Sequence, residues 1–86
     1  MKARGIMVYD FFEKEWRIWI GQQKYYMEPG SYFELRIKDK YFPAILQKDT
    51  DWFISLKYDV SFTLHPYSVY RVRIWKADYF LVPEEI

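Results

Sequence analysis

The residues best suited to catalysis or metal binding are few and lie far apart in the sequence. His65 is the single histidine of the 86-residue chain, and it stands in the segment TLHPY, where it could serve as a general base. Nothing beside it matches a nucleophile elbow, and with 3 glycines in the chain no phosphate-binding loop is expected. Asp49 and Asp51 could contact a cation, but a calcium loop of the EF-hand type needs more oxygen ligands and a glycine. We therefore expect a non-enzymatic protein with no cofactor and no metal site.

A different chemistry is suggested by the segment YRVRIW, Tyr70 to Trp75, in which arginines alternate with apolar residues. Successive side chains of a strand point to opposite faces, so the tyrosine, valine and isoleucine of this segment would enter a core. Arg71, Arg73 and Trp75 would then face outward. Arginine and tryptophan are enriched at binding hot spots, so this outward set predicts a contact surface rather than a plain solvent face.

Composition indicates one small domain, residues 1–86, held together by packing. Hydrophobic residues make up 51% of the chain and aromatic residues 23%, and there is no cysteine to form a disulfide. Such an aromatic content exceeds ordinary usage and suits both a core and an interface. The first ten residues contain no long apolar region, so we expect no signal peptide. No apolar run in the sequence is long enough to cross a membrane, so we expect no membrane partner and a cytoplasmic location.

Short alternating segments separated by turn residues are typical of an all-β protein. The segments expected as strands are 4–9, 16–20, 24–27, 32–38, 41–47, 52–58, 69–75 and 79–82, the third and the last of them short. Pro29-Gly30 suits a type II turn and Lys38–Lys40 a tight hairpin. A small antiparallel barrel of about six or seven strands fits this length. One alternative stays open: Phe12, Trp16 and Trp19 also share helical spacing, so a helix near 9–20 would make the protein α+β.

The alternation divides the strands into two faces. The residues expected to face the core are Trp16, Ile18, Ile20, Phe33, Leu35, Ile37, Phe42, Ala44, Leu46, Trp52, Ile54, Leu56, Tyr70, Val72 and Ile74. The candidate binding residues on the exposed face are Arg17, Trp19, Tyr32, Arg36, Tyr41, Ile45, Phe53, Arg71, Arg73 and Trp75. A second interpretation remains: loops could cover some of these aromatic rings, and arginine side chains could stack on others and shield them.

Several motifs, in this order, resemble the family called domain of unknown function 5348. They are Tyr9-Asp10, Trp16-Arg17-Ile18, Gly30 to Glu34, Tyr41-Phe42-Pro43, Trp52-Phe53-Ile54 and Val72-Arg73-Ile74. The resemblance covers about residues 5 to 75, with Tyr41 in place of a usual tryptophan and a different loop at 59–68. It implies an SH3-like β-barrel without known catalysis. The family consists of small bacterial proteins, frequent in Firmicutes, their phages and conjugative elements.

Two kinds of partner fit the exposed face. A net charge of +1, from 13 basic and 12 acidic residues, favours a protein, because phosphate binding gains from a broad positive field. Arginines on phosphates and aromatic stacking on bases would allow a nucleic acid instead. From the family context we expect a phage or mobile-element accessory protein that blocks a host protein, for example one of anti-phage defence, by direct stoichiometric binding.

Overall fold

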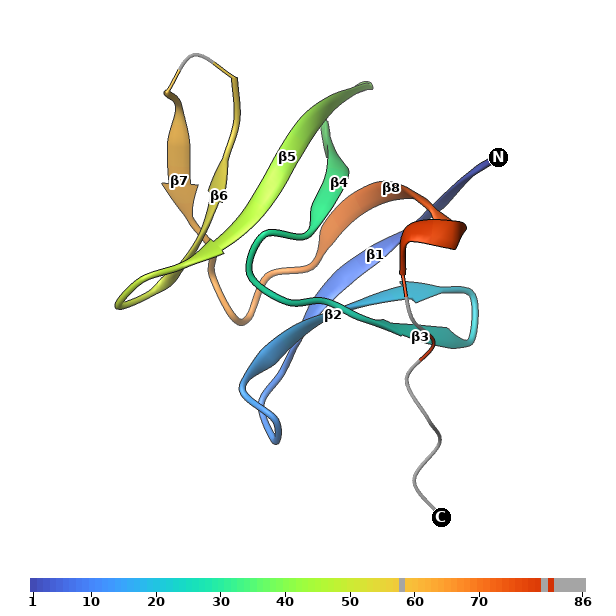
Figure 1. The fold of residues 1–86 in the computed structure, drawn as a ribbon, viewed down its shortest axis with the longest axis horizontal. Coiled ribbons are helices and arrows are strands. Elements are labelled where there is room, and N and C mark those ends of the chain that lie inside the picture. Colours follow the sequence, from blue (N-terminus) through green and yellow to red (C-terminus); the bar gives the residue numbers. More distant parts are fainter. Residues whose placement is uncertain (58, 80, 82–86) are drawn as a thin grey trace.

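A computed structural model of the chain describes residues 1–57, 59–79 and 81. These residues form eight strands and one short 3-10 turn (Figure 1). The elements are β1 (Lys2–Asp10), β2 (Glu15–Ile20), β3 (Gln23–Tyr26), β4 (Tyr32–Ile37), β5 (Lys40–Lys48), β6 (Trp52–Ser55), β7 (Ser61–Thr63), β8 (Tyr70–Trp75) and η1 (Lys76–Asp78). Among the described residues, no helix has the length and apolar character needed to cross a membrane.

All eight strands belong to one antiparallel sheet with the order β3-β2-β1-β8-β4-β5-β6-β7. Neighbouring strands in the sequence mostly pair as hairpins, while β8 inserts between β1 and β4. This insertion joins the first three strands to the next four, so β8, which carries the YRVRIW segment, lies at the centre of the sheet. The all-β antiparallel prediction is confirmed, with more strands than expected. The edge strands β3 and β7 do not pair with each other, so the sheet is not a closed barrel.

Two of the turns follow directly from their residues. Gly30 has φ +94°, and the Ser31 N–H donates to the Glu28 carbonyl, as the type II turn predicted for Pro29-Gly30 requires. Ile37 pairs with Lys40, which leaves Lys38 and Asp39 as a two-residue hairpin loop. Both predicted turns are therefore present, and the two-residue loop connects β4 directly to its antiparallel partner β5.

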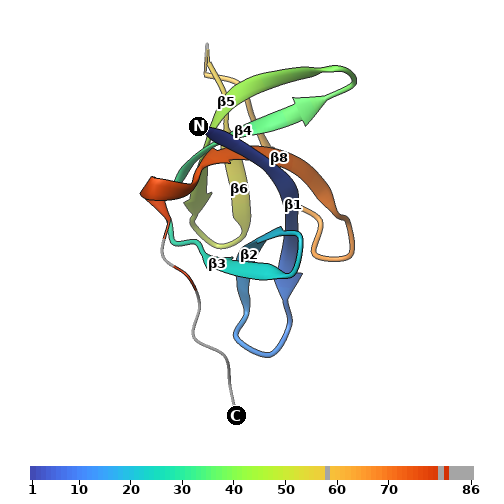
Figure 2. The ribbon, with the colours of Figure 1, turned by 90° about the vertical axis from the view of Figure 1, so that its right-hand side faces the viewer.

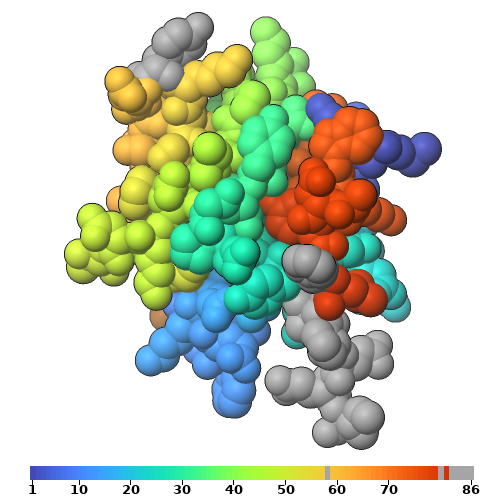
Figure 3. All heavy atoms as spheres, in the orientation of Figure 1, coloured from blue at the N-terminus to red at the C-terminus, as the bar shows by residue number. Residues whose placement is uncertain are grey.

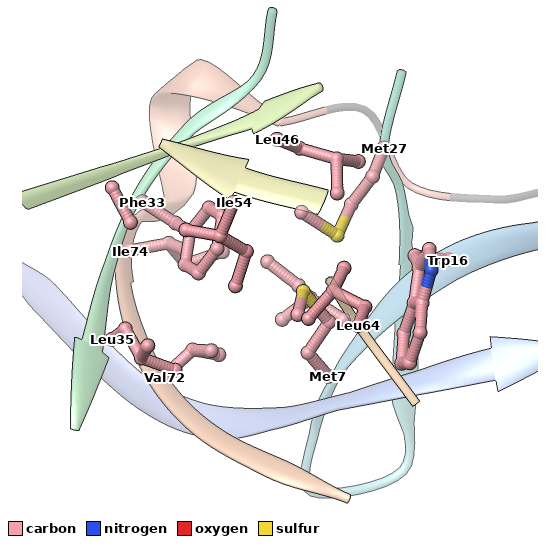
Figure 4. Close-up of a cluster of buried hydrophobic side chains, with 12 residues drawn as sticks. Met7, Trp16, Met27, Phe33, Leu35, Leu46, Ile54, Leu64, Val72 and Ile74 are labelled. Atoms are coloured by element: carbon pink, nitrogen blue, oxygen red, sulfur yellow. The ribbon is translucent and has the colours of Figure 1, made fainter. Parts of the chain in front are cut away.

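The sheet curls so that one face encloses the core (Figures 1 and 2). Gly5 in β1 allows a close approach: a Cβ atom there would lie 2.3 Å from the Trp19 carbonyl oxygen of β2. Side chains from six of the strands and from the segments after β3 and β7 fill the interior (Figure 4). The buried core consists of Met7, Trp16, Ile18, Met27, Phe33, Leu35, Ala44, Leu46, Ile54, Leu64, Val72 and Ile74.

Most of the predicted inward residues are buried or packed against this core, but two are not. Ile37 and Phe42 are each 40% exposed. Ile37 is next to the two-residue loop of the β4–β5 hairpin, and Phe42 pairs with the buried Leu35. The alternation predicted the face of both residues but not their exposure.

Other expectations need correction. Residues 9–20 form the end of β1, a turn and β2, so the helical alternative is wrong. The expected loop at 59–68 contains the short strand β7, and the expected strand 52–58 ends at Ser55. Of the expected strand 79–82, Leu81 forms an isolated bridge with Tyr25, while residues 80 and 82 lie outside the described residues, as does residue 58.

Candidate functional site

The strand pairings bring eight of the ten predicted contact residues onto one surface, the convex side of the sheet. This surface, called the outer face below, consists of Trp19, Tyr32, Arg36, Tyr41, Ile45, Arg71, Arg73 and Trp75. The register places them in rows across the strands: Tyr32 lies opposite Ile45, Arg36 opposite Tyr41, and Glu34 opposite Arg73. Residues on one face of opposed strands are close enough to interact, so these rows form a continuous surface.

The middle row of the outer face is a compact ion-pair network around Glu34. Arg73 donates two hydrogen bonds to the Glu34 carboxylate, from Nε to Oε1 and from Nη2 to Oε2, each 3.1 Å long. The Lys2 ammonium lies 2.8 Å from the same Oε1. The hydrogen bonds from Arg73, with the contribution of Lys2, hold the pKa of the buried Glu34 carboxyl below its ordinary value. Much of the positive charge at this centre is thus paired within the protein.

Cations also cover the aromatic rings beside this network. The Arg73 guanidinium lies 4.3 Å from the centroid of the Tyr41 ring, and Lys2 lies 5.8 Å from the Trp75 ring. Across β2 and β3, Lys24 lies 5.6 Å from the Trp19 ring. These are cation–π distances. The shielding that the sequence suggested as a second interpretation is therefore present for part of the outer face.

One row remains mainly apolar and partly open, with Lys2 beside Trp75 at one end. Ile45, Tyr32 and Trp75 are 38%, 49% and 44% exposed. Tyr32 pairs with Ile45, and the Glu34–Arg73 register, continued by two residues, brings Tyr32 opposite Trp75. This set, the apolar row, runs across β5, β4 and β8. Beside it, the Tyr79 hydroxyl donates to the Tyr32 carbonyl, and the space-filling view shows the red C-terminal turn against the teal segment that leads into β4 (Figure 3).

Arg17 does not belong to the open surface, although the sequence predicted it there. It is 6% exposed, because Val8 of β1 and Tyr26 of β3 lie opposite it on either side. Its guanidinium donates to the Glu15 carboxylate and to the Trp16 carbonyl and lies 5.0 Å from the Tyr26 ring. The remaining arginines differ in exposure: Arg71 is exposed, whereas Arg36 is half-buried and donates from Nε to the Lys38 carbonyl.

A second site, which the sequence did not reveal, lies at one open end of the curled sheet. The β1–β2 turn, the β5–β6 turn and the loop after β7 surround a pocket of about 290 Å³, called the end pocket below. Its lining residues are Tyr9, Lys14, Trp16, Lys48, Thr50, Asp51, Trp52, Thr63, Leu64 and Pro66. In the space-filling view, the blue β1–β2 turn and the yellow-green β5–β6 turn project beside each other (Figure 3).

The aromatic rings of the end pocket continue onto the surface. Trp16 contacts Tyr9 edge-on, Tyr9 contacts Phe11 in the same way at 5.0 Å, and Phe11 lies 5.1 Å from Tyr67. Tyr67 is almost fully exposed and Phe11 half-exposed. A pair of phenylalanines inside the charged turn DFFEKE was the one sequence signal for this surface. The pairing of that turn with a loop more than fifty residues away could not be read from local patterns.

The residues first considered for catalysis remain apart. His65 is exposed, and its backbone N–H donates to the Tyr70 hydroxyl. Asp49 and Asp51 share the β5–β6 turn, where the Asp49 N–H donates to the Asp51 carbonyl. Within residues 1–57, 59–79 and 81, no group of three or more acidic or histidine side chains is arranged to hold a metal ion.

The fold and these two surfaces define a small all-β protein whose exposed chemistry is aromatic and cationic. Residues 5–74 match the model of a protein family, Domain of unknown function (DUF5348), and the chain belongs to that family. The match ends within β8, so η1 and the contacts of Tyr79 lie beyond it. Neither the curated proteins nor the solved structures contain a significant match.

Proposed function

We propose that this chain is a non-enzymatic protein-binding module that contacts its partner through the outer face. The observation that carries the proposal is the apolar row, Ile45, Tyr32 and Trp75, exposed next to a centre whose charges are already paired. An apolar strip bordered by arginines is the composition of an interface core with a polar rim. Trp75 and Tyr32 are of the residue types that dominate binding hot spots.

The charge arrangement favours a protein over a nucleic acid as the partner. Glu34 lies in the middle of the outer face and binds both Arg73 and Lys2. A phosphate chain would have to compete with this carboxylate for the same cations. Arg4 and Arg71 offer exposed guanidinium groups on this face. With Arg73 and Lys2 held by Glu34, these two are fewer than the several phosphate contacts that give nucleic-acid affinity.

We further propose that the curled sheet is an SH3-like barrel, and that the protein acts in the cytoplasm of a bacterium as a stoichiometric blocker of a host protein. Anti-phage defence is one system in which such a blocker would act. The proposal of an SH3-like barrel is supported by the single core that the curled sheet encloses, which extends from Trp16 to Ile74 (Figure 4). The proposal of a stoichiometric blocker rests on the phage and mobile-element context of the DUF5348 family.

Site-specific photo-crosslinking in a bacterial lysate tests the proposal. Ile45 and Phe42 make a matched pair, since both belong to β5 and are 38% and 40% exposed, on opposite sides of the sheet. A benzophenone amino acid at position 45 should capture one protein, in a 1:1 adduct that survives nuclease treatment, and the same group at position 42 should not. Equal capture at both positions, or none at 45, would refute the outer face as the binding surface.

Nucleic acid is tested separately by titrating single- and double-stranded oligonucleotides at two salt concentrations. A protein-binding module should bind neither tightly. Tight binding whose log–log salt slope is about −0.7 to −0.9 per phosphate contact would establish the nucleic-acid alternative instead.

A further inference from the structure

From the end pocket we propose a second binding function, distinct from that of the outer face. The geometry points to a site for an extended peptide segment that inserts an aromatic or aliphatic side chain and places a carboxylate beside it. The two surfaces lie toward opposite ends of β1, because Lys2 pairs with Trp75 whereas Asp10 pairs with Glu15 at the turn that borders the pocket. A ligand in the pocket would therefore leave the apolar row uncovered.

The walls of the pocket specify the apolar part of the ligand. Tyr9, Trp16 and Trp52 contribute aromatic side chains, and Leu64 and Pro66 add aliphatic surface from the loop after β7. A volume of about 290 Å³ is at the lower end of the range for small-molecule sites, about 300–1,000 Å³. That size suits one large side chain with its flanking backbone better than a complete cofactor. The Phe11 and Tyr67 rings, tilted against each other, provide a further apolar surface for the peptide on either side of the inserted side chain.

The rim specifies the charge. Lys14 and Lys48 both line the pocket, from the β1–β2 turn and from the end of β5. Among the described residues, no carboxylate lies within ion-pair distance of either ammonium. Lys48 Nζ instead lies 5.0 Å from the centroid of the Trp52 ring, which holds the charge above an aromatic wall. Asp51 is the one acidic lining residue, so the lining carries two cations and one carboxylate.

Selection of peptides tests the inference. A library of random twelve-residue peptides is selected against the immobilised full chain, and the enriched sequences are synthesised with a fluorescent label. We expect each to contain Asp or Glu within two positions of an aromatic or aliphatic residue. Lys48→Glu should weaken their binding at least about tenfold, since it replaces an attractive rim charge by a repulsive one. Lys14→Asn should weaken binding severalfold, and asparagine tolerates the positive φ at that position.

Matched controls separate this site from the outer face. Lys40→Glu makes the same charge change at an exposed position of β5, eight residues from Lys48, and should leave peptide affinity unchanged. Trp75→Ala should also leave peptide affinity unchanged. The end-pocket proposal can therefore fail while the outer-face proposal stands, and the reverse. The inference is overturned if no peptide is enriched, or if the enriched peptides lack acidic residues. Peptides that bind the Lys48→Glu variant equally well, or oligonucleotides whose binding is lost in both lysine variants, would likewise overturn it.

Discussion

The outer face and the end pocket both combine cations with aromatic rings, yet they use the charges differently. On the outer face, Arg73 and Lys2 are held by Glu34 of the same protein. At the end pocket, Lys14 and Lys48 have no carboxylate within ion-pair distance among the described residues. A charge that is paired internally contributes to the fold and offers little to a ligand, whereas an unpaired one remains available for recognition.

This difference explains why binding at the two surfaces should depend on different groups. The outer face has to bind through its apolar row, because displacing Glu34 from its two cations would cost the fold an ion-pair network. The end pocket can bind through charge and shape together. In the two proposals, similar residue types therefore serve two different modes of binding, and the position of one glutamate largely separates them.

The largest expected effect concerns the core directly behind the outer face. Leu35 is buried on the inner side of β4, next to Glu34 in sequence. Leu35→Ala should lower the free energy of unfolding by about 2–5 kcal/mol, because it leaves a cavity in a packed interior. Ile37→Ala, on the same side of the same strand but 40% exposed, should cost about 1 kcal/mol or less. Urea denaturation of both variants measures the difference, and equal losses would show that the core extends to the hairpin tip.

The next effect tests whether the charges of the outer face are structural. Glu34→Gln removes the charge that Arg73 and Lys2 share and should cost about 1–2 kcal/mol at neutral pH, the scale of hydrogen bonds to charged groups. Glu13→Gln, an exposed glutamate of the β1–β2 turn, should change stability by no more than about 0.5 kcal/mol. If the two variants were equally stable, the network would contribute nothing and the contrast with the end pocket would disappear.

The same carboxylate predicts a pH dependence. Because the hydrogen bonds from Arg73 lower the pKa of Glu34 in the folded protein, its contribution is fully present above its ordinary value of 4.5. It should be lost as the pH falls through the lower pKa of the folded state. The stability difference between the wild type and Glu34→Gln should therefore shrink as the pH falls below 4.5, measured by thermal unfolding. A difference that stayed constant over this range would contradict the assignment.

A good part of this arrangement could be predicted from the sequence. Alternation placed Arg71, Arg73 and Trp75 outward and Val72 and Ile74 inward, because a strand has no other way to arrange them. Alternation could not reveal that β2 pairs with β3 and β1, whose Tyr26 and Val8 flank Arg17, so Arg17 was wrongly placed on the open surface. The end pocket could not be predicted from the alternation pattern either, because the pattern does not give the order of the strands in the sheet. Trp52 was predicted to face the core and Leu64 to lie in a loop, and only the order of the strands brings them together with Tyr9.

One substitution on the outer face and one at the end pocket should change stability little but should each affect binding at one surface only. Trp75→Ala and Lys48→Glu change exposed side chains, so each should alter the free energy of unfolding by about 1 kcal/mol or less. Trp75→Ala should weaken binding of the protein captured through position 45 by about thirtyfold, or about 2 kcal/mol, as the loss of an anchor does. It should leave peptide binding at the end pocket unchanged, and Lys48→Glu should do the opposite. Isothermal titration of both ligands against both variants gives four affinities, and equal losses in all four would mean that the surfaces are one site.

The smallest expected effect is at His65, which belongs neither to the outer face nor to the lining of the end pocket. Its side chain is exposed, and the fold uses only its backbone N–H, which donates to the Tyr70 hydroxyl. His65→Ala keeps that N–H and should leave stability within about 0.5 kcal/mol, with both binding activities unchanged. Tyr70→Phe is the matched variant, because it removes the acceptor, and it should cost about 1 kcal/mol. Loss of either binding activity in a folded His65→Ala protein would show that the imidazole itself takes part, and it would bring back the catalytic or metal-binding role that the chemistry around this residue does not support.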